Sequence, residues 1–350
     1  MQLPMIPRRL LIAPVVLAVL LAVFALAGPQ AGAAEQLNVY SARRYDSDTA
    51  LYESFTEATG IEVQVLQGNS DQLIARIQRE GAASPADVLM TVDVARLWRA
   101  EQAEVLSPVQ SDRLEERIPA NLRHPDNLWF GFSTRARLIF YRPEAVEPDA
   151  IATYESLADP AHRGAVCIRS STNVYNQSLI ASIIAANGAE AAQTWAEGLV
   201  ANFARSPQGG DTDQLRALAA GECDVAVANH YYYVRLKESE DPDDRAVADA
   251  IAVMLPNQQG RGAHINVGGA GVVKDAPNHG NAVRFLEFLA SAEAQALLAS
   301  GNYEFPVVPG VALPSGIGFL QGMRTDPVNV SVLGQHNAEA LRIADRAGWR

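Results

Sequence analysis

Two kinds of segment alternate along this chain. Short apolar runs rich in β-branched residues are followed by longer segments whose apolar residues have helical spacing. Short apolar or alternating runs predict strands, and apolar residues that recur every three or four positions predict helices. Strands are expected at 37–41, 61–68 and 86–92, and helices at 48–59, 71–80 (with Ser70 as its N-cap) and 94–103. Strands and helices that alternate in this way predict an α/β fold.

Two long extended segments, 128–141 and 264–275, bracket a second set of strands and helices. They are too long for one short sheet edge, and they favour strands that cross between two lobes closing like a clamshell. We therefore expect the boundaries lobe 1 at 35–134 with 268–310, lobe 2 at 135–267, and a C-terminal tail at 311–350.

The segments after the second extended run are also helical in pattern. One long helix is expected near 279–299, and another near 336–347 in the tail, whose packing the sequence leaves open. A glycine cluster at 268, 269 and 271 has two interpretations. It would allow the φ changes of a hinge, or it marks a close approach of two backbones.

The N-terminus has the pattern of a secretory signal peptide. Arg8 and Arg9 precede an almost wholly apolar run at 10–27, and the small residues Ala31, Gly32 and Ala33 follow it. This pattern predicts a signal peptide at 1–33 that is cleaved on export to the periplasm. The alternative is an uncleaved anchor, because about 18 apolar residues nearly span a bilayer.

Charge and motifs exclude several classes of function. The chain has a formal net charge of −12, and its acidic character disfavours binding to nucleic acid or anionic lipid. It contains no G-x-S-x-G, HExxH, P-loop or dinucleotide-binding motif. We therefore expect a protein that is not an enzyme.

Tyrosines follow the ends of three expected strands. Tyr45 lies beyond 37–41, Tyr175 beyond 165–170, and Tyr231, Tyr232 and Tyr233 beyond 224–229. In an open parallel sheet, ligands bind outside the carboxyl ends of the strands, so these side chains can converge although they are far apart in sequence. Several phenol oxygens at one point suit a hard, highly charged cation, and the pattern predicts Fe(III).

The chemistry of such a site follows from the phenol group. A free tyrosine has a pKa of about 10 and is a poor anion at neutral pH. A bound trivalent cation can displace the proton, and hard oxygen donors suit hard cations. Taken singly, each tyrosine also has an ordinary structural interpretation, since Tyr175 fits a helix start and the Tyr231–Tyr233 run fits an aromatic strand end.

Cys167 and Cys223 each lie eight residues before a tyrosine of the predicted site, Tyr175 and Tyr231. Export would place both cysteines in an oxidising compartment. If their strands are parallel neighbours in register, the two could approach disulfide distance. The sequence leaves open a disulfide and two buried free thiols.

Four segments together resemble one protein family. They are NVYSARRYDSDTALYESFTEATGI, GNSDQLIARIQREGAASPADVLMTVD, SSTNVYNQSL and CDVAVANHYYYVRL, within a similarity that runs from about Leu37 to residue 311. They resemble the periplasmic ferric-iron-binding proteins of ABC-type iron uptake systems. The resemblance implies a two-lobed periplasmic solute-binding fold of the clamshell, type II class with hinge-crossing strands, Fe(III) as bound cargo, an ABC permease in the inner membrane as partner, and a monomer.

The resemblance also assigns residues. The iron-ligating tyrosines of the family fall on Tyr45, Tyr175, Tyr231 and Tyr232, whereas Tyr233 stands where relatives have an aliphatic residue. Many relatives have a histidine ligand just before the first tyrosine, and here Arg44 stands there. Arginine has no lone pair for a metal. We therefore expect carbonate or water to complete the coordination, with Arg44 beside it as a counter-charge or anion partner.

An alternative is a receptor of the same fold for an organic or inorganic anion. Arginine pairs well with carboxylate and phosphate, and the candidate clamps are Arg43, Arg44, Arg135, Arg137 and Arg169. The tyrosine cluster favours a metal, because an anion receptor has no need of several phenols.

Overall fold

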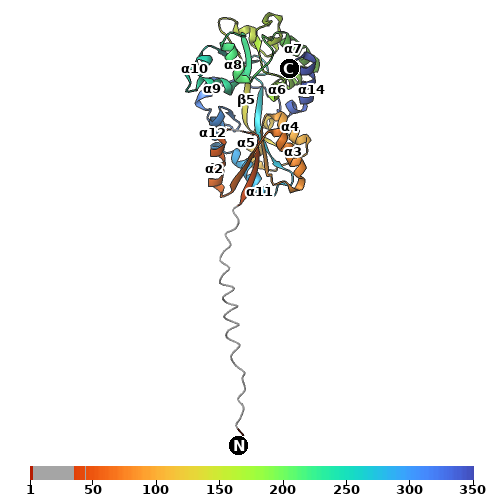
Figure 1. Ribbon diagram of the computed structural model, residues 1–350, viewed down its shortest axis with the longest axis vertical. Helices are drawn as coiled ribbons and strands as arrows, with labels where there is room; N and C mark the ends of the chain where they lie inside the picture. Colours follow the sequence, from red (N-terminus) through yellow and green to blue (C-terminus); the bar gives the residue numbers. More distant parts are fainter. Residues whose placement is uncertain (3–34, 44) are drawn as a thin grey trace. The chain divides into compact units, whose positions relative to one another are not determined.

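The computed structural model describes residues 1–2, 35–43 and 45–350. The predicted signal peptide, apart from its first two residues, and Arg44 lie outside the described residues. The unit Gln36–Arg350 contains all the helices and strands reported below (Figure 1). Within the described part of the chain, no helix combines the length and hydropathy of a membrane span.

A first sheet is built by the N-terminal strands. Strand β1 (Gln36–Ser41) lies parallel to β2 (Glu62–Gln67) on one side and to β3 (Val88–Val92) on the other. Strand β9 (Ile265–Val273) runs antiparallel to β3. All residues of β3 and β9 are buried, as expected for central strands covered on both faces.

Strand β5 (Phe130–Tyr141) belongs to two sheets. Its residues 130–136 pair with β9 in the first sheet, and residues 137–141 pair with β7 (Val225–Asn229) in the second. The second sheet also contains β6 (Val166–Cys167), parallel to β7, and β8 (Ala252–Met254), antiparallel to β5. The hydrogen-bonded order β2-β1-β3-β9-β5-β7-β6 is therefore continuous through β5. The change of partner falls at Ala136–Arg137, and the lobe boundaries stay a prediction.

The remaining elements flank these strands. The helices are α2 (Asp48–Thr59), α3 (Ser70–Glu80), α4 (Val94–Gln102), α5 (Asp112–Arg117), α6 (Val174–Asn187), α7 (Ala189–Ala201), α8 (Asp211–Ala219), α9 (His230–Lys237), α10 (Pro242–Asp249), α11 (His279–Leu289), α12 (Ala292–Asn302), α13 (Ser331–Gln335) and α14 (Asn337–Ala347). Two short strands, β4 (Leu106–Ser107) and β10 (Phe305–Pro306), pair with β9 and β5. Short 3-10 helices cover Gly81–Ala83, Ala120–Leu122, Pro148–Ile151, Glu155–Ala158, Pro160–His162 and Ser315–Leu320.

Two predictions about helix ends are wrong. Asn69, not Ser70, caps α3, because its side chain accepts a hydrogen bond from the amide of Asp71 at 2.9 Å. The single helix expected at 279–299 is two helices, α11 and α12. The chain is extended at Ser291, whose hydroxyl accepts from the amide of Ala294 and starts the second helix.

The glycines of β9 mark a close approach to β5. A Cβ atom at Gly269 would lie 2.5 Å from the carbonyl oxygen of Phe130, and one at Gly271 would lie 2.5 Å from that of Leu128. A Cβ at Gly268 would lie 2.8 Å from both the Arg135 guanidinium and the Ser133 hydroxyl. Of the two interpretations, close packing is therefore a sufficient reason for glycine here.

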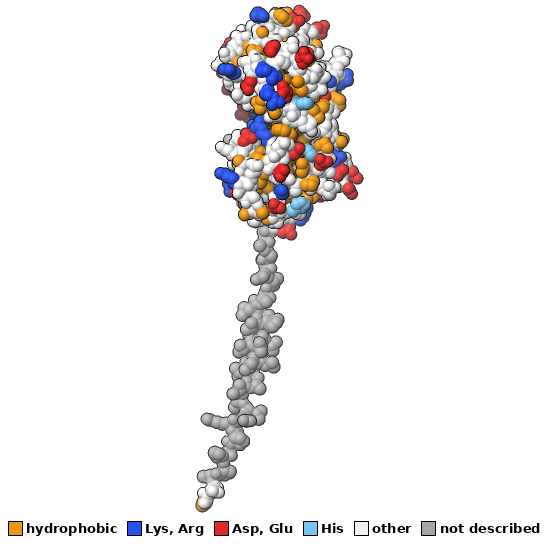
Figure 2. All heavy atoms as spheres, turned by 90° about the vertical axis from the view of Figure 1, so that its right-hand side faces the viewer, with side chains coloured by type: hydrophobic (Ala, Val, Ile, Leu, Met, Phe, Trp, Pro, Cys, Tyr) orange, Lys and Arg blue, Asp and Glu red, His pale blue; other side chains and the backbone are white. Residues whose placement is uncertain are grey.

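The C-terminal tail packs on helices that follow strands of both sheets. Helix α13 contacts α4 and α6, and α14 contacts α6 and α7 (Figure 1). Trp349, which follows α14, is fully buried. On the face drawn in Figure 2, acidic and basic side chains of the described part are interspersed.

Cys167 and Cys223 form a disulfide, with their Cα atoms 5.9 Å apart. Cys167 ends β6, and Cys223 lies two residues before β7 begins. The bond therefore links two neighbouring strands of the second sheet and closes a loop with a sequence separation of 56.

We predict that replacing both cysteines by alanine lowers the free energy of unfolding by roughly 2–5 kcal/mol, because the bond no longer restricts the unfolded chain. Urea denaturation of the mature protein, with and without reducing agent, measures this. Reduction of the wild type should reproduce the loss, and it should not affect the double variant. An unfolding midpoint that is the same in all four samples would contradict the prediction.

Candidate metal centre

Tyr175 lies in the first turn of α6. The side chain of Asn173 caps this helix by accepting a hydrogen bond from the amide of Tyr175 at 2.9 Å. The Tyr175 hydroxyl accepts a hydrogen bond from the Tyr231 hydroxyl at 3.3 Å. The guanidinium of Arg169 lies 5.4 Å from the centre of the Tyr175 ring. The cap thus fixes where the chain turns after β6 and aims this phenol at a second one.

Tyr231 and Tyr232 lie in the first turn of α9, directly after β7. Tyr231 is 1% exposed, and its hydroxyl accepts a hydrogen bond from the side-chain amide of Asn229 at 3.3 Å. The rings of Tyr231 and Tyr232 are tilted against each other with their centres 4.5 Å apart. The short turn between strand and helix therefore brings two phenols to the end of one strand.

The two residues that flank this pair in sequence, His230 and Tyr233, make packing and backbone contacts instead. Tyr233 packs against Phe140 and Phe319, with ring centres 5.3 and 5.9 Å apart. His230 is fully buried, and its two ring nitrogens contact the backbone of Ala136 and, at 2.7 Å, the carbonyl oxygen of Tyr303. Burial lowers the pKa of His230 to about 4, which keeps it neutral. Both side chains are accounted for by packing.

Tyr45 comes from the connection between β1 and α2. Its ring is half-buried, with the Arg43 guanidinium 4.8 Å from the ring centre. Burial raises the pKa of Tyr45, and the charge of Glu304 raises it further, whereas Arg135 and two other arginines lower it. The pKa of Tyr45 therefore depends on the charges of Arg135 on β5 and of Glu304 after α12.

The four phenols influence one another. Burial raises the pKa of Tyr231 well above its usual value, and charges on Tyr175, Tyr232 and Tyr45 raise it further. Burial likewise raises the pKa of Tyr175, and a charge on Tyr232 raises it further. The hydrogen bond between Tyr231 and Tyr175 and the ring contact between Tyr231 and Tyr232 bring three of these phenols close together. Without a cation between them, Tyr175 and Tyr231 are therefore protonated at neutral pH.

The candidate donors at this site are phenols. Across residues 1–2, 35–43 and 45–350, no group of three or more His, Cys, Asp or Glu is placed to hold a metal ion. Phenolate is a hard, anionic oxygen donor, and four of them suit a hard trivalent cation. Imidazole and thiolate ligands, which suit zinc or copper, do not come together in the described residues.

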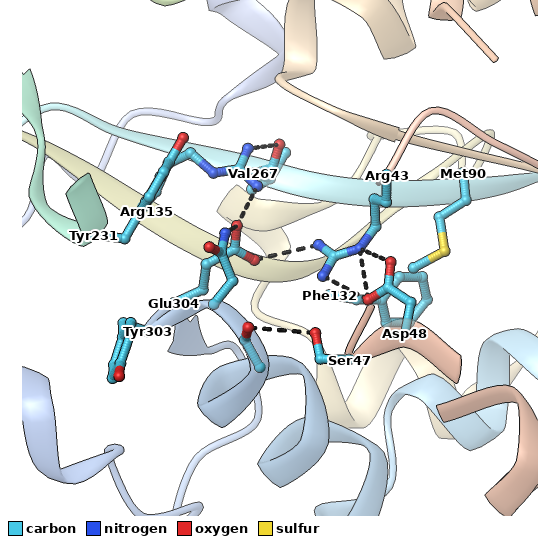
Figure 3. Close-up of polar contacts among 12 residues, drawn as sticks. Arg43, Ser47, Asp48, Met90, Phe132, Arg135, Tyr231, Val267, Tyr303 and Glu304 are labelled. Carbon is cyan, nitrogen blue, oxygen red and sulfur yellow. Dashed lines mark hydrogen bonds and ion pairs between the residues drawn. The ribbon is translucent and has the colours of Figure 1, made fainter. Parts of the chain in front are cut away.

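A buried ion-pair network lies beside the phenols (Figure 3). Glu304 accepts from Arg135 at 2.9 Å and from Arg43 at 3.3 Å, and Arg43 also contacts Asp48 at 3.1 Å. Arg135 in addition donates to the carbonyl oxygen of Val267 on β9 at 2.9 Å. The network joins α2, β5, β9 and Glu304, which lies two residues after α12. Its two arginines and two carboxylates balance each other.

A second network supports the other side of the site. Asp211 accepts from Arg137 at 3.0 Å and from Arg169 at 3.3 Å. Arg137 also donates to the side-chain oxygens of Asn229 at 3.1 Å and Asn176 at 2.7 Å. These two asparagines adjoin the phenols, since Asn176 follows Tyr175 and Asn229 contacts Tyr231. One carboxylate shared by two arginines leaves a net positive charge beside the tyrosines.

Arg235 is a residue that the sequence analysis missed. Its guanidinium lies 5.6, 5.3 and 5.7 Å from the ring centres of Tyr45, Tyr231 and Tyr232. It donates a hydrogen bond to the side-chain oxygen of Asn302 and has no carboxylate partner among the described ion pairs. The signal was helical spacing, because Arg235 lies four residues after Tyr231 on α9.

Comparisons with known proteins place the chain in a family of solute-binding proteins. The model of the bacterial extracellular solute-binding protein family matches residues 50–318. Iron uptake protein A1 of Synechocystis sp. is 51% identical over 319 residues, which cover 91% of this chain and 89% of that protein. These matches extend over nearly all of the chain after the predicted signal peptide.

Solved structures confirm the predicted fold class, a mixed α/β periplasmic solute-binding fold. A Trichodesmium protein (IdiA, FutA) in complex with iron and citrate is 52% identical, with a TM-score of 0.88 over 90% of this chain and 100% of that chain. The ferric-binding protein from Campylobacter jejuni is 40% identical, with a TM-score of 0.84 over 90% of this chain and 100% of that chain.

We predict that Glu304→Gln lowers the free energy of unfolding by roughly 3–5 kcal/mol, because it leaves Arg135 and Arg43 buried without their shared counter-charge. Although burial raises the pKa of Glu304, Arg135 and Arg43 lower it to about 2. A lowered folded-state pKa stabilises the fold above the unfolded pKa, near 4.5, and this contribution is lost as the pH falls toward 2.

Urea denaturation between pH 7 and pH 2.5 tests this prediction. The wild type should lose stability more steeply than Glu304→Gln below pH 5. Glu339→Gln is the control, because Glu339 pairs with Arg342 and Arg346 at the surface and should matter little. Equal stability of Glu304→Gln and the wild type at pH 7 would show that the network contributes nothing.

Proposed function

The chain belongs to the bacterial extracellular solute-binding protein family, and we propose that it binds ferric iron in the periplasm as cargo for uptake. The family consists of solute-binding transport proteins, not enzymes. The proposed ligands are the phenolates of Tyr45, Tyr175, Tyr231 and Tyr232. The observation that carries the proposal is the convergence of these four phenols, which come from three separate connections of the chain.

The protonation state of the site supports a trivalent cation. Phenols whose pKa is raised by burial stay protonated until a strong positive charge arrives between them. Fe(III) supplies that charge, and its phenolate bonds offset the cost of deprotonation. A monovalent or divalent cation offers less charge for the same loss of protons, so the site favours Fe(III).

The surrounding charges support a buried anionic complex. Four phenolates around Fe(III) carry a net charge of −1. Arg235 has no carboxylate partner among the described ion pairs, and the two arginines that share Asp211 leave one positive charge in excess. Carbonate or water would complete the coordination, and a small anion would also find guanidinium groups nearby. Arg44, the counter-charge expected from the sequence, lies outside the described residues, and its role stays a prediction.

The relatives support the same cargo. Iron uptake protein A1 of Synechocystis sp. shares half of its aligned residues with this chain, and the Trichodesmium structure contains iron and citrate. Solute-binding proteins of ABC transporters pass their ligand to a membrane permease. We therefore include delivery to an iron ABC permease of the inner membrane in the proposal.

The strand arrangement supports a cleft between two lobes. Tyr45 follows a strand of the first sheet, whereas Tyr175, Tyr231 and Tyr232 follow strands of the second. The sheets are joined through β5, so a bend in this strand would move Tyr45 away from the other three phenols. The proposed lobes are 35–134 with 268–310 and 135–267, which open and close around the metal.

The alternative of a receptor for an anion alone is less well supported. Arg43, Arg135, Arg137 and Arg169 all contact buried carboxylates. These guanidinium groups are therefore already engaged in charge-assisted hydrogen bonds. An anion receptor also leaves the clustered phenols without a role.

We predict that Tyr175→Phe, Tyr231→Phe and Tyr232→Phe each weaken Fe(III) binding more than the roughly 10–100-fold typical of residues that only orient a ligand. Tyr233→Phe is the matched control and should change the affinity little, because Tyr233 packs in the core. The mature protein is titrated with chelated Fe(III), and the visible tyrosinate-to-iron absorption band reports binding.

Two outcomes would contradict this series. Equal losses in all four variants would show that the assignment within the Tyr231–Tyr233 run is wrong. No loss in any variant, or no absorption band in the wild type, would refute the metal site altogether.

We predict that Fe(III) affinity falls steeply as the pH falls, because every phenol must release its proton to bind. The raised pKa values of Tyr175 and Tyr231 ensure that this proton is present at neutral pH. Proton release on binding can be counted by calorimetry in two buffers of different ionisation enthalpy. Tyr232→Phe should release about one proton fewer than the wild type. Binding without proton release would contradict phenolate ligation.

A further inference from the structure

The last turn of the chain contacts the connection that leads to Tyr175. This connection, residues 168–173, runs from β6 to α6. The indole nitrogen of Trp349 donates a hydrogen bond to the carbonyl oxygen of Arg169 at 3.0 Å. The hydroxyl of Ser171 donates to the carbonyl oxygen of Trp349. The 168–173 connection is thus held at two points by one residue from the end of the sequence.

Trp349 itself is firmly placed. Its side chain is fully buried and packs edge-on against Trp195 and Phe203, with ring centres 6.2 and 5.7 Å apart. Helix α14, which precedes it, packs on α6 and α7. An indole held in a close-packed core can fix the position of a neighbouring backbone.

A chain of hydrogen bonds leads from Trp349 to two phenols. The carbonyl oxygen of Arg169 also accepts from the Asn176 side chain at 2.7 Å, and Asn176 adjoins Tyr175 on α6. Asn176 accepts from Arg137 at 2.7 Å, and Arg137 donates to Asn229 at 3.1 Å.

The chain ends at the phenols. Asn229 donates to the Tyr231 hydroxyl at 3.3 Å, and this hydroxyl donates to Tyr175 at 3.3 Å. Every link joins residues that are buried or half-buried, where hydrogen-bond geometry is tightly constrained.

We propose that Trp349 is a positioning residue of the metal site, which holds the 168–173 connection so that Tyr175 and Tyr231 meet the metal. The proposal rests on the proposed function, since it concerns the same phenols. The hydrogen bonds and ring contacts of Trp349 within the described residues involve no tyrosine, and we infer that it acts through the carbonyl oxygen of Arg169. Residues that orient metal ligands in this way commonly change metal affinity about 10–100-fold when they are replaced.

The direct test is Trp349→Phe, which keeps an aromatic ring but removes the indole donor. The expected result is a loss of Fe(III) affinity of about 10-fold or more, with a shift of the tyrosinate-to-iron absorption band. The matched control is Trp129→Phe, because Trp129 is equally buried and its indole nitrogen has no hydrogen-bond partner within the described residues. The proteins should carry no tag fused next to Trp349, because Trp349 is buried and hydrogen-bonded.

A double-mutant cycle separates positioning from general destabilisation. If Trp349 acts through Tyr175, most of the loss caused by Trp349→Phe disappears in a Tyr175→Phe background and persists in a Tyr45→Phe background. Ser171→Ala, which removes the second contact, should reproduce part of the loss. Unfolding curves of the iron-free proteins show whether Trp349→Phe and Trp129→Phe destabilise the fold to a similar degree.

Three outcomes would overturn the proposal. They are unchanged affinity and absorption in Trp349→Phe, an equal loss in Trp129→Phe, or an equal loss in all backgrounds of the cycle. A wild-type protein that binds no Fe(III) would instead overturn the proposed function, and this proposal with it. Wild-type binding combined with an inert Trp349→Phe overturns the positioning role alone.

Discussion

The structure depends on one electrostatic constraint, because clustered phenols can be buried only while their charge is controlled. Burial and mutual repulsion raise the pKa of Tyr175 and Tyr231, so these two phenols are protonated at neutral pH. In the proposed function, a trivalent cation would reverse this balance and make the phenolates favourable ligands. The guanidinium groups around the site reduce the remaining negative charge. They in turn need carboxylates, and Glu304, Asp48 and Asp211 supply them.

Strand topology brings these groups together. The connections that follow β1, β6 and β7 each carry phenols, and β5 joins the two sheets to which these strands belong. Gly268 on β9 leaves room for Arg135, since a Cβ there would lie 2.8 Å from its guanidinium. Arg135 can therefore reach both Glu304 and the backbone of Val267 (Figure 3). The ion pair between Arg135 and Glu304 thus depends on the space that Gly268 leaves between the strands.

The C-terminal tail adds a further layer of support. Helices α13 and α14 contact α6, whose first turn contains Tyr175. Trp349 then fixes the connection before that helix through its indole nitrogen. In the proposed site, this segment would therefore influence where Tyr175 lies. This explains in physical terms why metal sites extend beyond the atoms that touch the metal.

The sequence by itself determined the elements and the candidate ligands. Strand and helix periodicity predicted the α/β fold, the long strand β5 and the helix α14, because these signals are local. Tyrosines placed after strand ends predicted that Tyr45, Tyr175 and Tyr231 could meet, because parallel strands end at a common edge. The break between α11 and α12 was missed, since their apolar spacing continues through the extended Ser291.

Tertiary structure alone decided which charged residues form ion pairs and which residues hold the 168–173 connection in place. The contact of Arg43 with Glu304 joins residues 261 positions apart, and the contact of Trp349 with Arg169 joins residues 180 positions apart. Many arginines and glutamates could form such pairs, and only packing selects the partners. Helical spacing connects Arg235 with Tyr231, but only the folded backbone brings it beside the Tyr45 ring. The contact of Trp349 with Arg169 likewise depends on the folded backbone.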